Sequence, residues 1–311
     1  METRPSTTAL IAALGRAFHA EHEQPAIFAD TVAAQWFTPE LRARLTANMI
    51  ASVGYFAPGV TPENDTEALG SVFRASATPI TLTRARYVED VLERWGTARW
   101  SRPSTRMHGP RFTQYVILGA GLDSYAWRAE HPAEGLRVIE LDLPATQNWK
   151  KKRIAELGLA SKVDVALVPA DLATEKVADV LATAGFDPSV PTLFAWMGVT
   201  YYLPLEAVRG MFAQLAAIAA PGSAVVFDLL DDVAFDDTRV ASPIKRMRDA
   251  VAMAKEPMLT GLSRAQLGAM LAETGWKLAE VLGPAEIQQQ YLLHSAGYEA
   301  LPHFEIARAE R

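Results

Sequence analysis

The chain has 311 residues, of which 50% are hydrophobic and 21% are charged, and its formal net charge is −6. This composition is typical of a globular protein with one large or two small α/β domains. The acidic balance argues against a nucleic-acid partner, because binding to phosphates requires a basic surface. The chain contains no cysteine, which excludes disulfides, thiolate metal sites and cysteine nucleophiles.

Neither a targeting segment nor a membrane span is predicted. The first residues lack the apolar core of a signal peptide. Pro204 and Pro221 interrupt the most apolar stretches before they reach the length that crosses a membrane. We therefore expect a cytoplasmic protein that has no membrane partner.

The first hundred residues are predicted to be mainly helical. Leu10, Leu14 and Phe18 recur at helical spacing in the first of these helices. Helices are predicted over residues 7–22, 26–37, 39–49 and 83–95, with a loop over residues 54–64. No long flexible linker follows, so residues 1–100 are interpreted as a helical cap on a second unit, residues 101–311.

Strands and helices alternate in the second unit. Strands are predicted over residues 115–118, 137–142, 163–168, 192–198 and 224–228, with helices that include 174–184 and 205–219. Residues 277–282 and 304–308 are expected to form a closing antiparallel pair. This alternation predicts an α/β fold with a doubly wound, mostly parallel sheet of seven strands. Ligands bind such a sheet at the carboxyl ends of its strands.

A lid over that edge is predicted from the chain after the fifth parallel strand. Residues 231–237 are rich in aspartate and are expected to form an exposed loop, and residues 243–255 are expected to form a helix. We interpret residues 231–262 as a lid. The spacing of the aspartates, which include Asp228 and Asp231, fits no calcium loop, so no metal site is predicted.

The strongest functional feature is a strand that ends in two glycines, Gly119 and Gly121, with Ala120 between them. A helix is predicted to begin directly afterwards, and such a turn leaves backbone N–H groups free for a polar ligand. The dinucleotide fingerprint requires a third glycine at the position of Ser124. The turn therefore predicts a nucleotide-like cofactor, without choosing between a dinucleotide and S-adenosylmethionine.

Acidic residues end the next two strands. Glu140 lies 21 residues after Gly119 (140 − 119), and Asp142 lies 23 residues after it (142 − 119). An acid at this position suits the binding of ribose hydroxyls in either cofactor. Asp171 ends the third strand, where it can meet an adenine amino group or simply cap the following helix.

Two arginines, Arg84 and Arg86, open the predicted helix over residues 83–95. Either guanidinium can bind a carboxylate with two parallel hydrogen bonds. The alternative is that both belong to the solvated start of a helix.

Five segments in this order carry a family resemblance. They are Thr83–Asp90, Leu118–Ser124, Glu140–Pro144, Ala170–Leu172 and Gly198–Pro204. Together they resemble the leucine carboxyl methyltransferase family, a branch of the S-adenosylmethionine-dependent methyltransferases whose bacterial members include many small-molecule O-methyltransferases. The resemblance covers nearly the whole chain. It implies a class I methyltransferase fold of the Rossmann-like type and S-adenosylmethionine as the cofactor.

The resemblance also implies how the methionine part of the cofactor is bound. Arg84 and Arg86 would hold its carboxylate. Gly119, Ala120 and Gly121 would pass beneath the methionine part.

For the adenosine part, the resemblance implies that Glu140 and Asp142 lie at the ribose, with Asp142 the more direct ligand. Asp171 and Leu172 would frame the adenine. Met197 departs from the family, because many members have glutamate at this position. A polar contact to the cofactor is therefore either lost or replaced by an apolar surface.

The methyl acceptor is expected to bind near Trp196, Met197, Tyr201, Tyr202 and residues 243–258. Apolar walls suit an aromatic or polyketide-like small molecule, methylated on a hydroxyl or a carboxylate. A carboxylate needs no general base, whereas a phenol with a pKa near ~10 benefits from one. Tyr201, Tyr202 and His294 are candidates for that base, but each is better explained as a packing or pocket-wall residue.

Three other functions stay open at this point. They are a nicotinamide-dependent oxidoreductase, a protein C-terminal carboxyl methyltransferase, and a binding module that keeps the cofactor fold without activity. The missing third glycine and the segment with Arg84 and Arg86 argue against the oxidoreductase. The sequence determines neither the acceptor nor the oligomeric state.

Overall fold

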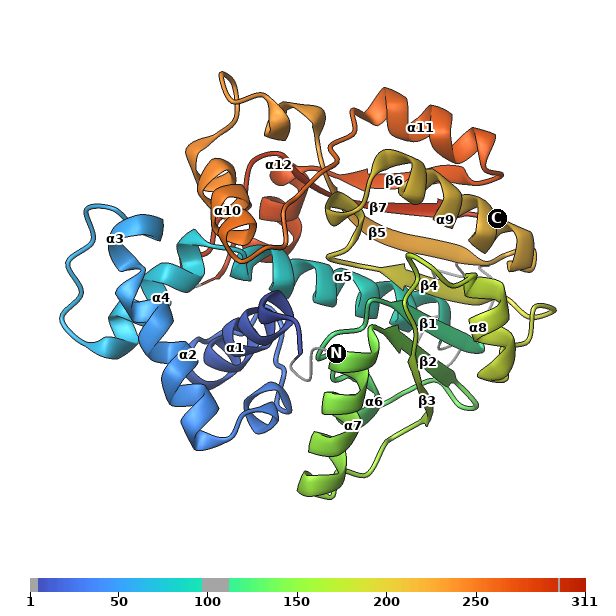
Figure 1. The fold of residues 1–311 in the computed structure, drawn as a ribbon, viewed down its shortest axis with the longest axis horizontal. Coiled ribbons are helices and arrows are strands. Elements are labelled where there is room, and N and C mark those ends of the chain that lie inside the picture. The colour runs from blue at the N-terminus through green and yellow to red at the C-terminus, as the bar shows by residue number, and fades with distance from the viewer. Residues whose placement is uncertain (1–4, 97–111, 296) are drawn as a thin grey trace, which may run out of the picture.

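The computed structural model of the protein describes residues 5–96, 112–295 and 297–311. Within these residues the strands form one seven-stranded sheet in the order β3-β2-β1-β4-β5-β7-β6 (Figure 1). The strands are β1 Gln114–Leu118, β2 Arg137–Asp142, β3 Asp164–Pro169, β4 Thr192–Trp196, β5 Ala224–Leu230, β6 Lys277–Leu282 and β7 Phe304–Glu310. Strands β1 to β5 pair in parallel, and β7 pairs antiparallel with β5 and β6. The predicted doubly wound, mostly parallel α/β sheet is confirmed.

Helices cover both faces of this sheet. They are α1 Thr7–His22, α2 Pro39–Ala51, α3 Val53–Phe56, α4 Asp65–Ala75, α5 Thr78–Gly96, α6 Tyr125–Arg128, α7 Pro144–Leu157, α8 Val177–Thr183, α9 Leu205–Ile218, α10 Ser242–Met253, α11 Arg264–Glu273 and α12 Pro284–Ile287. The short elements are three 3-10 turns, η1 Ala33–Trp36, η2 Thr200–Tyr202 and η3 Asp232–Phe235, and one π-helical turn, η4 Gln288–Leu292. None of the helices, over the described residues, has the length and apolar character needed to cross a membrane.

The central strands explain why the sequence shows continuous apolar runs. Strands β1, β4 and β5 are buried along their whole length. Helices α8, α9 and α11 pack on one face of the sheet, and α5 packs on the other. A strand buried on both faces has no polar side, so it does not alternate.

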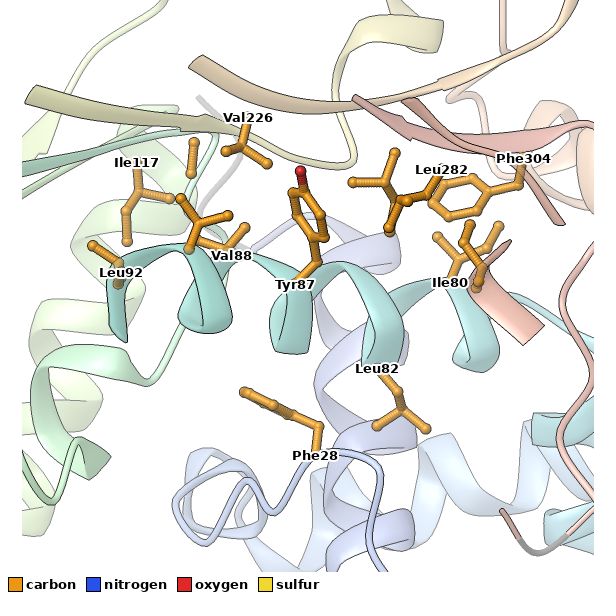
Figure 2. Close-up of a cluster of buried hydrophobic side chains, with 14 of the residues drawn as sticks. Phe28, Ile80, Leu82, Tyr87, Val88, Leu92, Ile117, Val226, Leu282 and Phe304 are labelled. Carbon is orange, nitrogen blue, oxygen red and sulfur yellow. The ribbon is translucent and has the colours of Figure 1, made fainter. Parts of the chain in front are cut away.

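Helix α5 brings the N-terminal region directly onto the sheet. Tyr87, Val88 and Leu92 point from α5 toward the strands, where Ile117 of β1 and Val226 of β5 complete the cluster (Figure 2). The helix begins at position 78, five residues before its predicted start. It therefore forms one layer of the α/β core and not only a cap. The predicted unit boundary near residue 100 lies outside the described residues.

The predicted helix over residues 26–37 is wrong, because only η1 is helical there. The Asp30 carboxylate accepts hydrogen bonds from the backbone N–H groups of Val32 (3.2 Å) and Ala33 (3.0 Å). It also accepts one from Arg16 Nε at 2.9 Å. A short acidic side chain that binds nearby amides holds the backbone in a turn and competes with a helix. The structure also contains α4 at residues 65–75, where no helix or strand was predicted.

Residues 231–262 leave the sheet at the end of β5 and return to the same place. Asp231 N donates to His303 O (2.9 Å), and Leu262 N donates to Leu230 O (3.0 Å). Between them lie η3 and α10, so the predicted acidic loop is partly a 3-10 turn with Ala234 buried inside it. Movement of this segment as a lid stays a prediction.

Candidate active site

The glycine turn lies at the carboxyl end of β1. Gly119 and Gly121 have φ angles of +73° and +53°, a region that disfavours residues with a Cβ. A Cβ at Gly119 would lie 2.5 Å from Val199 Cγ2, so no larger residue fits without displacement. The turn therefore touches the loop that follows β4. The predicted helix after the turn is only the four-residue α6.

The backbone N–H groups of this turn are bonded within the protein, which corrects the expectation that they are free. Gly119 N and Ala120 N donate to Leu141 O at 2.9 and 3.0 Å. Gly121 N donates to Asp142 Oδ2 at 2.6 Å. The turn thus offers close approach to the main chain, and its amides hold the end of β2 in place.

Asp142 is the acid that the structure brings to the turn. Its carboxylate lies between Gly121 and the first residues of α7, and burial raises its pKa while the Gly121 and Leu143 amides oppose that rise. Ala170 N donates to Asp142 O at 2.8 Å, so the end of β3 lies beside it. There, Asp171 Oδ1 accepts a hydrogen bond from Ala173 N at 3.0 Å within a turn, and Leu172 is half-buried. Asp171 does not cap the following helix, because α8 begins only at Val177 after Lys176.

Glu140 lies on the same strand, but its carboxylate is sealed in the protein. Its partner is Lys150 of α7, and both side chains are 0% exposed. The Lys150 ammonium lies 4.9 Å from the centroid of the Trp127 ring. Burial raises the pKa of Glu140 to about 7, although the charge of Lys150 lowers it. The structure therefore does not bring Glu140 and Asp142 together as two accessible acids.

Arg84 extends from α5 to the carboxyl ends of β4 and β5. Its Nη1 atom lies 3.3 Å from Asp228 Oδ2 and 3.4 Å from the Tyr201 hydroxyl. Gly198, the second residue after β4, donates its N–H to Asp228 Oδ1 at 2.6 Å. A Cβ at Gly198 would lie only 2.3 Å from Arg84 Nη1. The glycine at position 198 is thus what lets the guanidinium approach the loop.

Asp228 was not among the predicted cofactor residues. It was grouped with the aspartates of the following loop, although the structure separates it from them as the buried acid inside β5. A polar residue in an otherwise apolar strand, close to its carboxyl end, was the signal that could have identified it.

Arg86 lies apart from Arg84. Two residues on a helix differ in direction by about 200°, so the two side chains leave α5 on different faces. Arg86 Nε lies 2.8 Å from Asp90 Oδ1, and 48% of the side chain is exposed. The structure therefore brings Arg84, but not Arg86, to the strand ends.

The four predicted acceptor residues divide between two faces. Trp196 is 1% exposed and packs in the core, with its ring centroid 5.4 Å from that of Phe212. Met197 packs on the α5 side instead. Tyr201 and Tyr202 lie together, with ring centroids 4.9 Å apart.

None of the three predicted candidates for the general base is supported by its surroundings. Burial raises the pKa of both tyrosines, Tyr201 and Tyr202, above the ordinary value of 10.0. Neither phenol is thus a ready base at neutral pH. His294 is exposed, and no contact among the described residues joins it to the site.

The N-terminus of α1 and the segment after α10 meet beside the glycine turn, which the sequence did not indicate. A Cβ at Gly121 would lie 3.4 Å from Ala9 Cβ. The Glu256 carboxylate accepts hydrogen bonds from the hydroxyls of Ser6 (3.1 Å) and Thr8 (2.6 Å). Leu259 N donates to Tyr201 O at 2.6 Å, so the same segment also reaches the acceptor side.

Fold and site together define a class of protein. A doubly wound seven-stranded sheet with an antiparallel β7, a glycine turn after β1 and an acid at the end of β2 is the architecture of class I methyltransferases. A crystal structure of a provisionally named methyltransferase from Thermobifida fusca YX shares the fold, with a TM-score of 0.53 at 15% identity over 99% of this chain and 96% of that one. A DUF574 family protein from Streptomyces avermitilis MA-4680 gives 0.51 at 14% identity, over 85% and 97%.

Sequence comparison identifies the family. The leucine carboxyl methyltransferase family model matches residues 9–216. YktD of Bacillus subtilis (strain 168), provisionally named an S-adenosyl-L-methionine-dependent methyltransferase, is 30% identical over 289 residues, 92% of this chain and 91% of its own. A protein of the same provisional name from Mycobacterium bovis (strain BCG / Pasteur 1173P2) is 37% identical over 137 residues, 44% of this chain and 45% of its own.

The chain belongs to the leucine carboxyl methyltransferase family. As a member it is an S-adenosylmethionine-dependent methyltransferase, which confirms the predicted family and cofactor. The nicotinamide-dependent alternative is thereby set aside.

Proposed function

We propose that this enzyme transfers the methyl group of S-adenosylmethionine to an oxygen atom of a small molecule, either a hydroxyl or a carboxylate. The observation that best supports this proposal is a continuous line of contacts along the carboxyl edge of the sheet. Asp142 bonds to Gly121, Gly119 touches Val199, and neighbouring Gly198 touches Arg84. Asp142, which would bind the sugar, and Arg84, which would bind the amino-acid end, thus lie on opposite sides of one glycine turn.

The proposed cofactor contacts follow from this line. Arg84 would bind the carboxylate of the methionine part, and Asp142 would accept hydrogen bonds from ribose hydroxyls. Asp171 and Leu172, beside Asp142, would frame the adenine, and Met197 would supply an apolar surface. When bound, the cofactor supplies a methyl group that its own sulfonium activates.

Three predicted residues are left out of this proposal for physical reasons. Arg86 is half exposed and paired with Asp90. Glu140 is sealed with Lys150, and Trp196 is in the core. A ligand could reach Glu140 or Trp196 only after the surrounding core had opened.

The acceptor would lie against Tyr201 and Tyr202, which line the side next to Arg84. Rigid aromatic walls favour a flat, apolar acceptor, and correct orientation alone can lower the barrier by roughly 7–11 kcal/mol. Residues 231–262 would act as the lid, because both ends are anchored at β5 while Leu259 bonds to Tyr201. The described residues before the sheet, 5–96, would cap the same edge.

The test is methyl transfer from labelled S-adenosylmethionine to a panel of phenols and aromatic acids, and to a cell extract separated into small molecules and protein. We expect label in small molecules. Mild base releases the label from a methyl ester but not from an aryl ether, which distinguishes the two oxygen classes. Label found only in protein would overturn the proposal and favour a C-terminal carboxyl methyltransferase.

A further inference from the structure

Asp228 joins three parts of the molecule from inside the sheet. It lies in β5 opposite Ile306 of β7, and its side chain is 0% exposed. One carboxylate oxygen accepts from Gly198 N at 2.6 Å, and the other lies 3.3 Å from Arg84 Nη1. The acid therefore fixes a helix side chain relative to the loop after β4.

The bond to Asp228 leaves most of the guanidinium available. Both hydrogen bonds of Arg84, to Asp228 and Tyr201, leave from Nη1. Within the described part of the chain, Nε and Nη2 have no partner, and 18% of the side chain is exposed. A guanidinium presents two parallel N–H groups to a carboxylate, so the Nε–Nη2 edge is suited to a second acid.

Stability alone is a poor reason for this buried pair. Desolvating two charges costs several kcal/mol, and well-packed apolar residues of similar size often serve a fold equally well. Burial raises the pKa of Asp228, and the nearby Arg84 charge opposes that rise. A role in fixing the orientation of Arg84 accounts for this desolvation cost, because a long arginine side chain otherwise samples many rotamers.

We propose that Asp228 is a positioning residue that holds Arg84 with its Nε–Nη2 edge facing the carboxylate of the cofactor's methionine part. This inference rests on the proposed function. Asp228 itself touches neither cofactor nor acceptor. It acts by removing the rotamer freedom that Arg84 would otherwise lose on binding.

The test compares two ligands that differ in the group Arg84 would bind. S-adenosylhomocysteine carries the carboxylate, and 5′-methylthioadenosine lacks the whole amino-acid part. For Asp228→Asn, calorimetry is expected to show the Kd of S-adenosylhomocysteine rising by about tenfold or more. The Kd of 5′-methylthioadenosine is expected to change by less than about twofold.

Glu305→Gln is the matched control. Glu305 lies on the neighbouring β7, is 6% exposed, and pairs with Arg264 at 2.7 Å, away from the line of site contacts. Glu305→Gln removes a similar buried charge, but away from the site contacts. Both Kd values are therefore expected to stay as in the wild type. Arg84→Lys provides a second variant that keeps a cation beside Asp228 and is expected to show the same selective loss.

Equal weakening of both ligands by Asp228→Asn, or no weakening despite a lower unfolding midpoint, would overturn the positioning role. If Asp228→Asn does not fold, an unchanged ratio of the two Kd values in Arg84→Lys would equally overturn the positioning role, because Asp228 would then have no carboxylate-binding side chain to position. If the wild type binds neither ligand, the proposed function itself fails, which is a distinct result. If the double variant Asp228→Asn/Arg84→Lys binds S-adenosylhomocysteine no more weakly than either single variant does, the two residues act as one unit.

Discussion

Two ion pairs link helices to strands near the carboxyl edge of the sheet, and they differ in one respect. Lys150 and Glu140 are both 0% exposed, and the ammonium also lies near the rings of Trp127 and Trp36. In the other pair Asp228 is equally buried, but Arg84 keeps 18% of its side chain exposed. The first pair is closed, whereas the second has a cation that can still bind something else.

The comparison shows that a buried charge does not by itself mark a site. What distinguishes the two pairs is whether the cation keeps part of its side chain exposed and has donors without a partner among the described residues. Lys150 lies inside the protein below the edge, and Arg84 lies on it. Three changes test this difference and a fourth tests the adenosine side of the site, and they are given in order of decreasing expected effect.

Lys150→Met is expected to be the most damaging. It keeps the apolar stem but leaves the Glu140 carboxylate buried without its partner, and breaking a buried pair costs about 3–5 kcal/mol. Denaturant unfolding at pH 8 measures this loss. The control is Lys152→Met on the same helix, where 76% of the side chain is exposed and the loss should be under about 0.5 kcal/mol. A loss below about 1 kcal/mol at Lys150 would contradict a closed pair.

The same pair predicts a pH dependence of stability. The pKa of Glu140 is raised from 4.5 to about 7, so the folded state holds its proton more tightly than the unfolded state. The free energy of unfolding is therefore expected to fall as the pH rises from about 4.5 to about 7, by roughly 3 kcal/mol from this group. Glu140→Gln should lack that decline. A constant difference between wild type and variant from pH 4 to 8 would contradict it.

Gly198→Ala tests the open pair without altering either charge. The added Cβ would lie 2.3 Å from Arg84 Nη1, and the φ angle of +74° further disfavours alanine. Arg84 must then move away, and S-adenosylhomocysteine should bind about 1.5–3 kcal/mol more weakly. Gly268→Ala on α11, where a Cβ meets nothing within 4 Å, is the calorimetric control. Equal affinities of the two variants would contradict the role of Gly198.

Asp142→Ala tests the adenosine side and is expected to have the smallest effect. Loss of the proposed hydrogen bonds to ribose should weaken S-adenosylhomocysteine binding by about 1–3 kcal/mol. Asp164→Ala, at the opposite end of the sheet on β3 and paired with Arg137, should leave the Kd unchanged. An unchanged Kd for Asp142→Ala would remove that residue from the site.

Much of the fold could be predicted from local patterns. Apolar runs that end in glycine or acid indicated five parallel strands, because a strand buried on both faces must be apolar throughout. The secondary-structure prediction failed where a side chain forms hydrogen bonds to nearby backbone amides, because the sequence pattern did not indicate those bonds. The Asp30 carboxylate bonded to the amides of Val32 and Ala33 replaces most of the expected helix over residues 26–37.

The sequence by itself determined the family, the sheet and the glycine turn, because these depend on residue order and spacing along single strands and turns. Only the tertiary structure decided which charged residues meet. The sequence did not distinguish Arg84 from Arg86, and only the family resemblance favoured Asp142 over Glu140. Helix rotation separates the two arginines, and depth within the core separates the two acids. Asp228 of β5 contacts Arg84 of α5, which lies 144 residues earlier in the chain. No local sequence pattern predicts a contact over that separation.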